Sequence, residues 1–341
     1  GYFDMVILSG VLEWVAFEQE VVLEAHWGKR RSDSATYSKN PRQVQLEALG
    51  EIQRVLKPGG HLHLAIENRI GYQYLAGYPD DHVNIRYVPF LPRFIANAIT
   101  KWKLNCEYRT YIYSLRGYRS LLKDSGFQDV EFYGAFPHYI LPSEIIPVNL
   151  IKYWKKTLLP VDSPIVPFYV RVAAKIFPKG LLKYVSPSFI AIAKTAGEKQ
   201  NELRIIQLLR KTGLLPDSTL ANMKIAKCRG RCGNYHPANF QIYKKNEPKP
   251  SYFCKVCRDN KHVGILQDEA DNLKVVNKLL ADTELNSSIP KLFYFGTIDK
   301  ITFLVTQFIE GEPSRFDLHT SLSKNNLMKL DESIHWRLGF W

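Results

Sequence analysis

Apolar runs and helical periodicities alternate along the first part of the chain. Residues 5–8, Met-Val-Ile-Leu, form an uninterrupted apolar run, which is the pattern of a parallel strand covered on both faces. Residues 43–56 carry apolar side chains near helical spacing and stop at a Lys-Pro-Gly-Gly turn, residues 57–60. Residues 61–67 alternate as a second strand. A strand, a helix and a strand joined by a short turn predict a right-handed parallel crossover.

The same alternation continues toward the middle of the chain. Residues 118–126 predict a short helix that ends at a glycine, and residues 130–136 predict the strand after it. After a stretch broken by prolines, residues 188–195 predict one more strand with a polar exit. We therefore expect an α/β domain over residues 1–197, with a boundary near Gly197.

A smaller second unit is expected over residues 198–341. It opens with a linking helix near residues 202–209, and a longer helix at 266–280 places Glu269 and Leu273 on the same side. The remaining pattern predicts short strands, at 225–229, 239–244, 252–258, 291–296 and 301–308. Strands that surround one long helix indicate an α+β unit.

Composition and cysteine usage narrow the class of protein. At 45% apolar and 23% charged residues, the 341-residue chain has ordinary globular composition. Five cysteines and no signal-peptide pattern favour a reducing, cytoplasmic environment, and no apolar run approaches the ~20 residues that span a bilayer. The chain starts at Gly1 directly before a strand and stops inside an amphipathic pattern, so we expect a piece of a longer protein.

The formal charge of +13 is spread along the chain, which favours solvated surfaces over a nucleic-acid partner. Residues 145–194 are the exception, because eight Lys or Arg stand against the single Asp162 with aromatic residues interleaved. This segment is a candidate for peripheral contact with an anionic membrane surface.

Two segments carry a specific resemblance. Residues 2–14, which include Ser9-Gly10-Val11-Leu12-Glu13, and residues 51–62 resemble the fourth strand, the following helix and the fifth strand of class I methyltransferases that use S-adenosylmethionine. In such a doubly wound sheet the ligand lies beyond the carboxyl ends of the strands. The resemblance implies that residues 9–13 contact S-adenosylmethionine.

A narrower match follows the second strand. Residues 67–74, with Gly77, Asp80, Asp81 and His82, resemble a bacterial subgroup often associated with surface-polysaccharide or glycosyl-modification genes. The resemblance implies a glycan or glycolipid-related acceptor, faced by Glu67, Asn68, Arg69 and His82. His82 or Asp81 would take the proton of an acceptor hydroxyl. The alternative is an ion pair between Glu67 and Arg69 at a strand end, with His82 a loop histidine.

The methyltransferase resemblance covers roughly residues 1–196. The glycine-rich turn and the ribose-binding acid of the family would both precede Gly1, so we expect these residues alone to bind S-adenosylmethionine weakly or not at all. Residues 137–187 become a basic insertion in the last hairpin of the sheet. This insertion would either cap the acceptor site or form a packing subdomain.

A second resemblance rests on the order of five segments in the second unit, at residues 228–234, 239–243, 252–256, 268–269 and 303–313. In that order they resemble the N-lobe of aminoglycoside-phosphotransferase-like kinases. The resemblance implies that Lys255 contacts nucleotide phosphates and pairs with Glu269, while Gly230 and Gly233 form the phosphate-covering turn. ATP and Mg²⁺ would be its cofactors. Residues 307–311 would be the hinge of the lobe. The catalytic aspartates of the family lie beyond the hinge, so we expect this unit alone to be catalytically inactive.

Four cysteines leave a different interpretation open. Cys228, Cys232, Cys254 and Cys257 have the number and nearly the spacing of tetrahedral zinc ligands. Against this zinc ribbon, no glycine or proline forms a knuckle between Cys254 and Cys257, and residues three apart on a strand point to opposite faces.

The sequence thus predicts an α/β chain with a truncated Rossmann-like methyltransferase sheet and an α+β kinase-like N-lobe. The parent protein would be a methyltransferase with a possible phosphotransferase unit. An alternative from another class is a non-catalytic binding or scaffold protein in which both folds have lost their chemistry.

Overall fold

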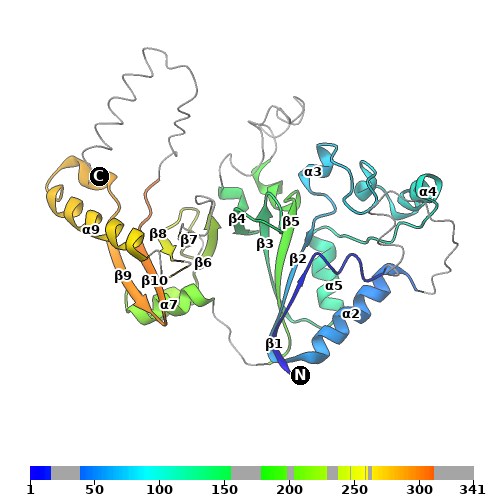
Figure 1. The fold of residues 1–341 in the computed structure, drawn as a ribbon, viewed down its shortest axis with the longest axis horizontal. Helices are drawn as coiled ribbons and strands as arrows, with labels where there is room; N and C mark the ends of the chain where they lie inside the picture. Colours follow the sequence, from blue (N-terminus) through cyan, green and yellow to red (C-terminus); the bar gives the residue numbers. More distant parts are fainter. Residues whose placement is uncertain are drawn as a thin grey trace, which may run out of the picture. The chain divides into compact units, whose positions relative to one another are not determined.

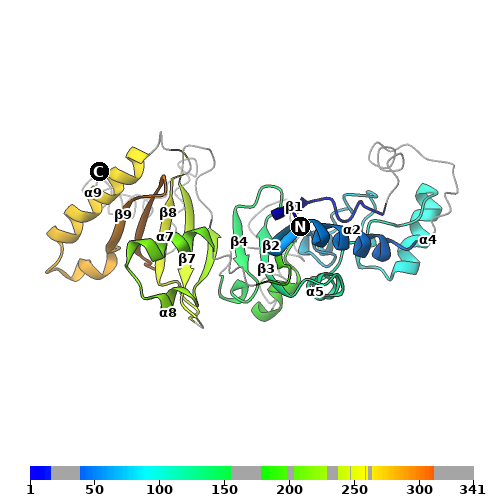
Figure 2. The ribbon, with the colours of Figure 1, turned by 90° about the horizontal axis from the view of Figure 1, so that it is seen from below.

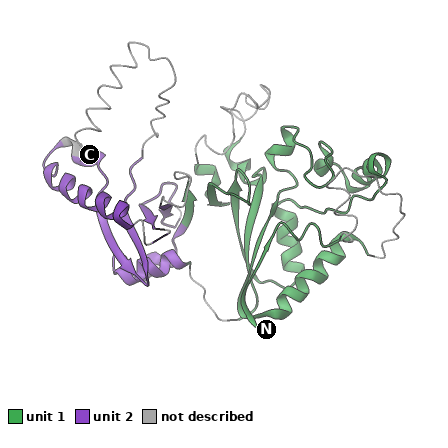
Figure 3. Cartoon of the chain, in the orientation of Figure 1, with its two compact units in different colours: residues 1–203, 225–229 green, residues 204–224, 230–341 purple. Residues whose placement is uncertain are grey.

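The computed structural model describes residues 1–16, 39–154, 178–197, 203–228, 237–245, 247–257, 259 and 263–310 (Figure 1). The chain has mixed α/β content and divides into two compact units (Figure 3). The first comprises Gly1–Leu203 with Ile225–Arg229, and the second comprises Arg204–Lys224 with Gly230–Trp341. The first division along the chain therefore falls a few residues after the expected boundary at Gly197.

The first unit is built on a sheet with the strand order β1-β2-β5-β3-β4. β1 and β2 run parallel, whereas β5 is antiparallel to both β2 and β3, and β4 is antiparallel to β3. The bounds are β1 Phe3–Ser9, β2 Leu56–Glu67, β3 Asp129–Phe136, β4 Glu144–Pro147 and β5 Ser188–Lys194. The predicted strand at 188–195 is thus confirmed as the partner of the strand at 130–136.

Helix α2, Pro41–Val55, connects the two parallel strands, as the crossover pattern predicts. Asn40 caps the helix, because its side chain accepts a hydrogen bond from the Gln43 N–H at 3.0 Å. The Lys-Pro-Gly-Gly stretch lies within β2 as a bulge, where Gly59 takes a φ of 70°. Pairing therefore jumps from Phe3 with Leu56 to Met5 with His61.

Helix α5, Leu115–Asp124, packs beside α2 against the sheet (Figures 1 and 2). It begins three residues before the predicted start, at a Ser114 cap, and is followed by Gly126 with a φ of 90°. Tyr118, Leu121 and Leu122 are fully buried. This apolar face holds α5 in the core of the unit.

The prediction that β1 is covered on both faces is wrong for the described part of the chain. The side chains of Phe3, Met5 and Ile7 are 54%, 56% and 67% exposed. β1 lies at the edge of the sheet and pairs with β2 alone among the described strands. A continuous apolar run therefore identified a strand correctly but not its surroundings.

Several elements of the first unit have no counterpart in the sequence analysis. Helix α4, Arg93–Leu104, is the longest of them, and the others are short: α3 Tyr72–Leu75, η1 Val88–Phe90, η2 Ile151–Tyr153, η3 Lys179–Tyr184 and β4. α4 buries the small residues Ala96 and Thr100, while Phe94 and Trp102 are 76% and 81% exposed. Ile99 and Leu104 pack with Ala96 in the core, so the apolar side chains of α4 are divided between its buried and its exposed faces.

The second unit contains an antiparallel sheet with the strand order β7-β8-β10-β9. Helix α9, Val263–Leu279, packs on β9 and β10 through a core of Leu266, Ala270 and Leu304 (Figure 2). The other bounds are α7 Arg204–Thr212, α8 Asp217–Leu220, β7 Ala238–Tyr243, β8 Tyr252–Val256, η5 Glu284–Ser288, β9 Leu292–Ile298 and β10 Ile301–Gln307. Apart from η5 and α8, each was predicted from the sequence.

β6, Lys224–Cys228, was predicted as a strand of the second unit, but most of it clusters with the first. Ile145 of β4 pairs with Lys227 of β6. The Lys227 ammonium donates hydrogen bonds to the carbonyls of Pro142 and Ser143, at 2.7 and 3.2 Å. None of the helices in the described ranges combines the length and apolarity needed to cross a membrane.

We expect Leu121→Ala to lower the free energy of unfolding of the first unit by ~2–5 kcal/mol, because Leu121 is fully buried and truncation leaves a cavity. Leu141→Ala is the matched control, since Leu141 is 83% exposed. Urea unfolding followed by circular dichroism measures both. Equal effects of the two changes would contradict the placement of α5 in the core.

Candidate functional site

Two segments that were assigned separate roles in the sequence meet at one edge of the sheet. Residues 9–13 follow the end of β1, and Glu67 is the last residue of β2. Because β1 and β2 are parallel neighbours, their carboxyl ends lie at the same edge, where ligands bind in open α/β sheets. The Gly10 N–H donates to the Ala65 carbonyl at 2.9 Å and joins the two ends directly.

Buried polar side chains hold the turn after β1 through hydrogen bonds to its carbonyl groups. Gln45 of α2 donates to the Leu12 carbonyl at 3.0 Å, and the Arg109 guanidinium donates to the Ala16 carbonyl at 2.9 Å. Both side chains are buried. The Tyr118 hydroxyl donates to the Glu67 carbonyl at 2.9 Å and fixes the end of β2 in the same way.

Four buried residues form an acid–histidine cluster at this edge, namely Glu13, Glu67, Asp80 and His82. Their exposed fractions are 1%, 4%, 0% and 3%. One side-chain ligand atom from each of Glu13, Glu67 and His82 lies within 4.8 Å of the other two. Residues predicted to bind the cofactor and residues predicted to face the acceptor therefore share one buried site.

Asp80 holds His82 in place. Its Oδ1 accepts hydrogen bonds from the backbone N–H groups of His82 and Val83, at 2.8 and 3.1 Å, and lies 3.1 Å from His82 Nδ1. Its Oδ2 accepts a hydrogen bond from the Tyr108 hydroxyl at 2.9 Å. The other ring nitrogen, Nε2, lies 4.0 Å from Glu13 Oε1. Asp80, whose two oxygens both have partners, thus orients the His82 ring so that Nε2 faces Glu13.

The electrostatics of the cluster follow from this crowding of carboxylates. Burial alone would lower the pKa of His82, but the hydrogen bond and charge of Asp80 and the nearby Glu13 raise it to about 10. Burial raises the pKa of Glu13 above its ordinary value. His82 therefore carries a proton at neutral pH when no other cation is present. An imidazolium cannot accept a second proton, so Asp81 is the better of the two predicted bases.

Asp81 lies at the exposed side of the cluster. One oxygen of Asp81 lies within 4.8 Å of ligand atoms of Glu67 and His138, and His138 Nε2 is 3.6 Å from Glu67 Oε1. Partial burial and the charge of Glu67 raise the pKa of Asp81. The cluster thus has a buried side at Glu13 and a solvent-facing side at Asp81.

Asn68 and Arg69 take structural positions instead of facing an acceptor. The Asn68 side chain donates to the carbonyls of Tyr184 and Ser186, at 2.7 and 2.6 Å. Arg69 donates to the carbonyls of Pro89 and Leu91, at 2.5 and 2.7 Å, rather than pairing with Glu67. Both residues fasten loops to the end of β2.

The sequence analysis did not assign site roles to Asp80, Tyr108 or His138. Asp80 had a local signal, because a carboxylate two residues before His82 accepts backbone N–H groups in an Asx-type turn. His138 and Tyr108 lie 71 and 41 residues after Glu67 along the chain, and no spacing rule connects them. Only the folded arrangement brings them to the cluster.

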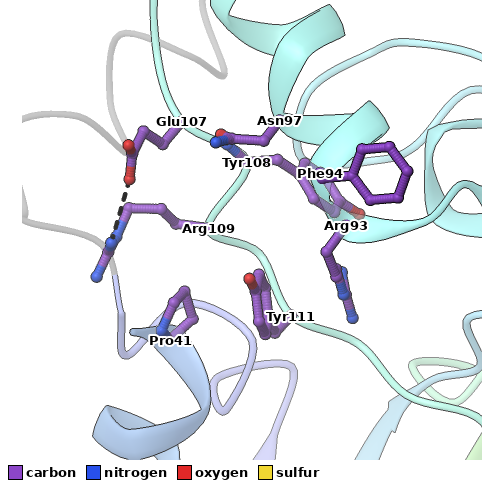
Figure 4. A pocket seen from close by; sticks show the side chains of 8 residues that line it. All are labelled: Pro41, Arg93, Phe94, Asn97, Glu107, Tyr108, Arg109 and Tyr111. Atoms are coloured by element: carbon purple, nitrogen blue, oxygen red, sulfur yellow. Dashed lines mark hydrogen bonds and ion pairs between the residues drawn. The ribbon is translucent and has the colours of Figure 1, made fainter. Parts of the chain in front are cut away.

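A shallow pocket of about 180 Å³ lies on the other side of Tyr108 (Figure 4). The Arg93 guanidinium lies 4.0 Å from the centre of the Tyr111 ring and donates to the Ile112 carbonyl at 2.6 Å. The pocket is lined by Pro41, Arg93, Phe94, Asn97, Glu107, Tyr108, Arg109 and Tyr111. It contains none of the predicted site residues.

In the second unit, Lys255 of β8 and Glu269 of α9 form the expected ion pair. The Lys255 ammonium lies 2.5 and 2.7 Å from the two Glu269 oxygens, and both side chains are about one-third exposed. Gly230 and Gly233, predicted to cover phosphates, lie outside the described residues, as do residues 311–313 of the hinge segment. A nucleotide role for Lys255 stays a prediction.

The cysteines of the zinc alternative are only partly described, because Cys232 lies outside the described residues. Cys254 is buried in the sheet, where burial raises the pKa of its thiol to about 12. The Cys257 thiol donates to the Asp259 carbonyl at 2.9 Å. The described portion of the chain shows no grouping of three cysteines at metal-binding distance.

No family model, no curated protein and no solved structure matched this chain. The resemblances therefore rest on the residues quoted for them.

We expect Asp80→Ala to lower the free energy of unfolding by ~3–5 kcal/mol, because it leaves a buried imidazolium, two N–H groups and the Tyr108 hydroxyl without their acceptor. Asp129→Ala is the control, since the Asp129 side chain is 68% exposed. Urea unfolding followed by tryptophan fluorescence tests the difference. A loss below ~1 kcal/mol for Asp80→Ala would show that the cluster does not depend on this carboxylate.

Proposed function

We propose that the first unit belongs to an S-adenosylmethionine-dependent methyltransferase that acts on a glycan or glycolipid-related acceptor. The observation that carries the proposal is the convergence of the β1 and β2 carboxyl ends on one site, with Glu13 contributed by the first and Glu67 by the second. The hairpin of β3 and β5 agrees with the expected last strands of the sheet. The proposed acceptor class comes from the resemblance of residues 67–82.

The residues after β1 fit their proposed part of a cofactor site. Gly10 has a φ of 62°, and a side chain there would collide with the Tyr139 hydroxyl, so this position requires glycine. Val11 is exposed, whereas Leu12 and Glu13 are buried behind it. Ser9, Gly10 and Val11 would hold the cofactor, which supplies a methyl group on a positively charged sulfur. Bare backbone at the end of a parallel strand is the usual place for such an approach.

Asp81 would act on the acceptor. It is exposed, and its raised pKa makes it a stronger base than an ordinary aspartate. Glu67 and His138 flank it and would orient an acceptor hydroxyl. When no cation is bound, His82 is protonated and fixed by Asp80, and it would position Glu13 and Glu67 electrostatically instead of moving a proton.

We expect Gly10→Val to weaken S-adenosylmethionine binding by the full gene product at least tenfold, because a β-branched residue is strained at positive φ and meets Tyr139. Calorimetric titration measures the affinity, and circular dichroism checks the fold. Gly50→Val is the matched control, since nothing lies near Gly50 on α2. Wild-type affinity in the Gly10 variant, or no binding by the unmodified protein, would contradict the proposal.

We expect Asp81→Asn to lower kcat for methyl transfer by ~10²–10⁴-fold, because the amide cannot take a proton. Asp129→Asn is the control on an exposed strand position. Transfer of a radiolabelled methyl group to a glycan pool measures the rate. An unchanged kcat would remove the proposed role of Asp81.

For the second unit we infer nucleotide binding, on the basis of the Lys255–Glu269 ion pair. A strand lysine held by a helix glutamate is the arrangement that positions nucleotide phosphates in kinase-like N-lobes. We expect Lys255→Met to weaken ATP binding at least tenfold in the presence of Mg²⁺, with Lys274→Met on α9 as control. Equal affinity of both variants would leave the ion pair with a structural role and favour the scaffold alternative for this unit.

A further inference from the structure

We propose that Glu13, Glu67 and His82 bind a divalent metal cation of the Mn²⁺ or Zn²⁺ kind. The proposal goes beyond methyl transfer, because neither resemblance assigns a metal to these residues. It also requires no methyl donor, so it stands or falls separately from the proposed function.

The first observation is the spacing of the ligand atoms. His82 Nε2 and Glu13 Oε1 lie 4.0 Å apart, which is too long for a hydrogen bond. In a tetrahedral site, two metal–ligand bonds of ~2.1 Å hold their ligand atoms ~3.4 Å apart, so these two atoms would approach by about 0.6 Å to bind one cation. The third ligand atom, from Glu67, lies within 4.8 Å of both, and small side-chain rotations bring it to bonding distance.

The second, independent observation is that three of the four carboxylate oxygens of Glu13 and Glu67 are buried and have no hydrogen-bond partner among the described residues. Both oxygens of Glu13 and Oε2 of Glu67 are inaccessible and accept no hydrogen bond from any residue that the structure describes. Glu13 is 1% exposed, and its carboxylate is aimed into the group formed with Glu67 and His82. A buried carboxylate is either protonated or stabilised by a positive partner at bonding distance. A divalent cation supplies it to both at once.

The surroundings of His82 match those of a metal-bound histidine. A histidine that ligates a metal through one ring nitrogen usually donates the other N–H to a carboxylate, which fixes the ring and strengthens the ligand. Asp80 lies 3.1 Å from Nδ1 and is itself held by Tyr108 and two backbone N–H groups. Nε2 is left facing Glu13.

The site borders a second, more exposed group of ligand side chains. Asp81 and His138 form a second group with Glu67, and both are more exposed than the first three ligands. A hydrated cation would meet Asp81 and His138 first and lose water as it moves toward Glu13. Nitrogen and carboxylate ligands without thiolate suit Mn²⁺ and Zn²⁺.

The test uses Mn²⁺ alone, because thiolates of the chain's cysteines bind Mn²⁺ poorly and would compete for Zn²⁺. The full chain is treated with a chelator and titrated with Mn²⁺ by calorimetry and by electron paramagnetic resonance of the free ion. We expect one equivalent to bind. Glu13→Gln and Glu67→Gln should each weaken binding at least tenfold, and Asp80→Asn by ~10–100-fold. Glu51→Gln, exposed on α2, is the matched control.

Two results overturn the proposal: the absence of stoichiometric Mn²⁺ binding by the folded protein, or binding that both glutamine variants retain at full affinity. Near-ultraviolet circular dichroism of each variant checks the fold. If Glu13→Gln does not fold, Glu67→Gln decides alone, because Glu67 lies nearer the solvent-facing side of the cluster.

Discussion

The first unit depends on the balance of charge around His82. Three carboxylates, those of Glu13, Glu67 and Asp80, are buried at the end of two parallel strands, and one imidazole lies among them. Buried negative charge of this density is stable only with positive charge beside it. In the absence of a metal, protonated His82 supplies this positive charge, because its pKa is raised to about 10. A divalent cation would replace that proton, since a metal ligand must be deprotonated.

Strand and helix positions followed from local chemistry wherever the buried face was also the apolar face. Helix α2 and strands β3 and β5 lie within about two residues of their predicted bounds, because the Lys-Pro-Gly-Gly stretch and Gly126 mark where the helices before β2 and β3 stop. Helix α4 escaped prediction because it buries Ala96 and Thr100 while it exposes Phe94 and Trp102. Periodicity reports which face is apolar, and the apolar side chains of α4 are divided between the core, where Ile99 and Leu104 pack with Ala96, and the surface.

The site was predictable in part for a geometric reason. Parallel neighbours end at the same edge, so a strand pattern that places Glu13 and Glu67 after two such strands also places them near each other. Adjacent Asn68 and Arg69 point elsewhere because their side chains donate hydrogen bonds to loop carbonyls. That choice depends on where residues 89–91 and 184–186 run, which no local pattern encodes. The position of His138 near Glu67 likewise depends on the path of a distant segment and is not encoded by a local pattern.

The exposed edge strand β1 has a consequence for how the protein behaves in the test tube. Its outer backbone groups have no strand partner among the described residues, and Phe3, Met5 and Ile7 are more than half exposed. An apolar strand with a free edge is a template for pairing with the same strand of another molecule. The seven residues of β1 are therefore a place where two copies of the isolated polypeptide can pair, and a lysine at position 5 or 7 would oppose that pairing without touching the acid–histidine cluster.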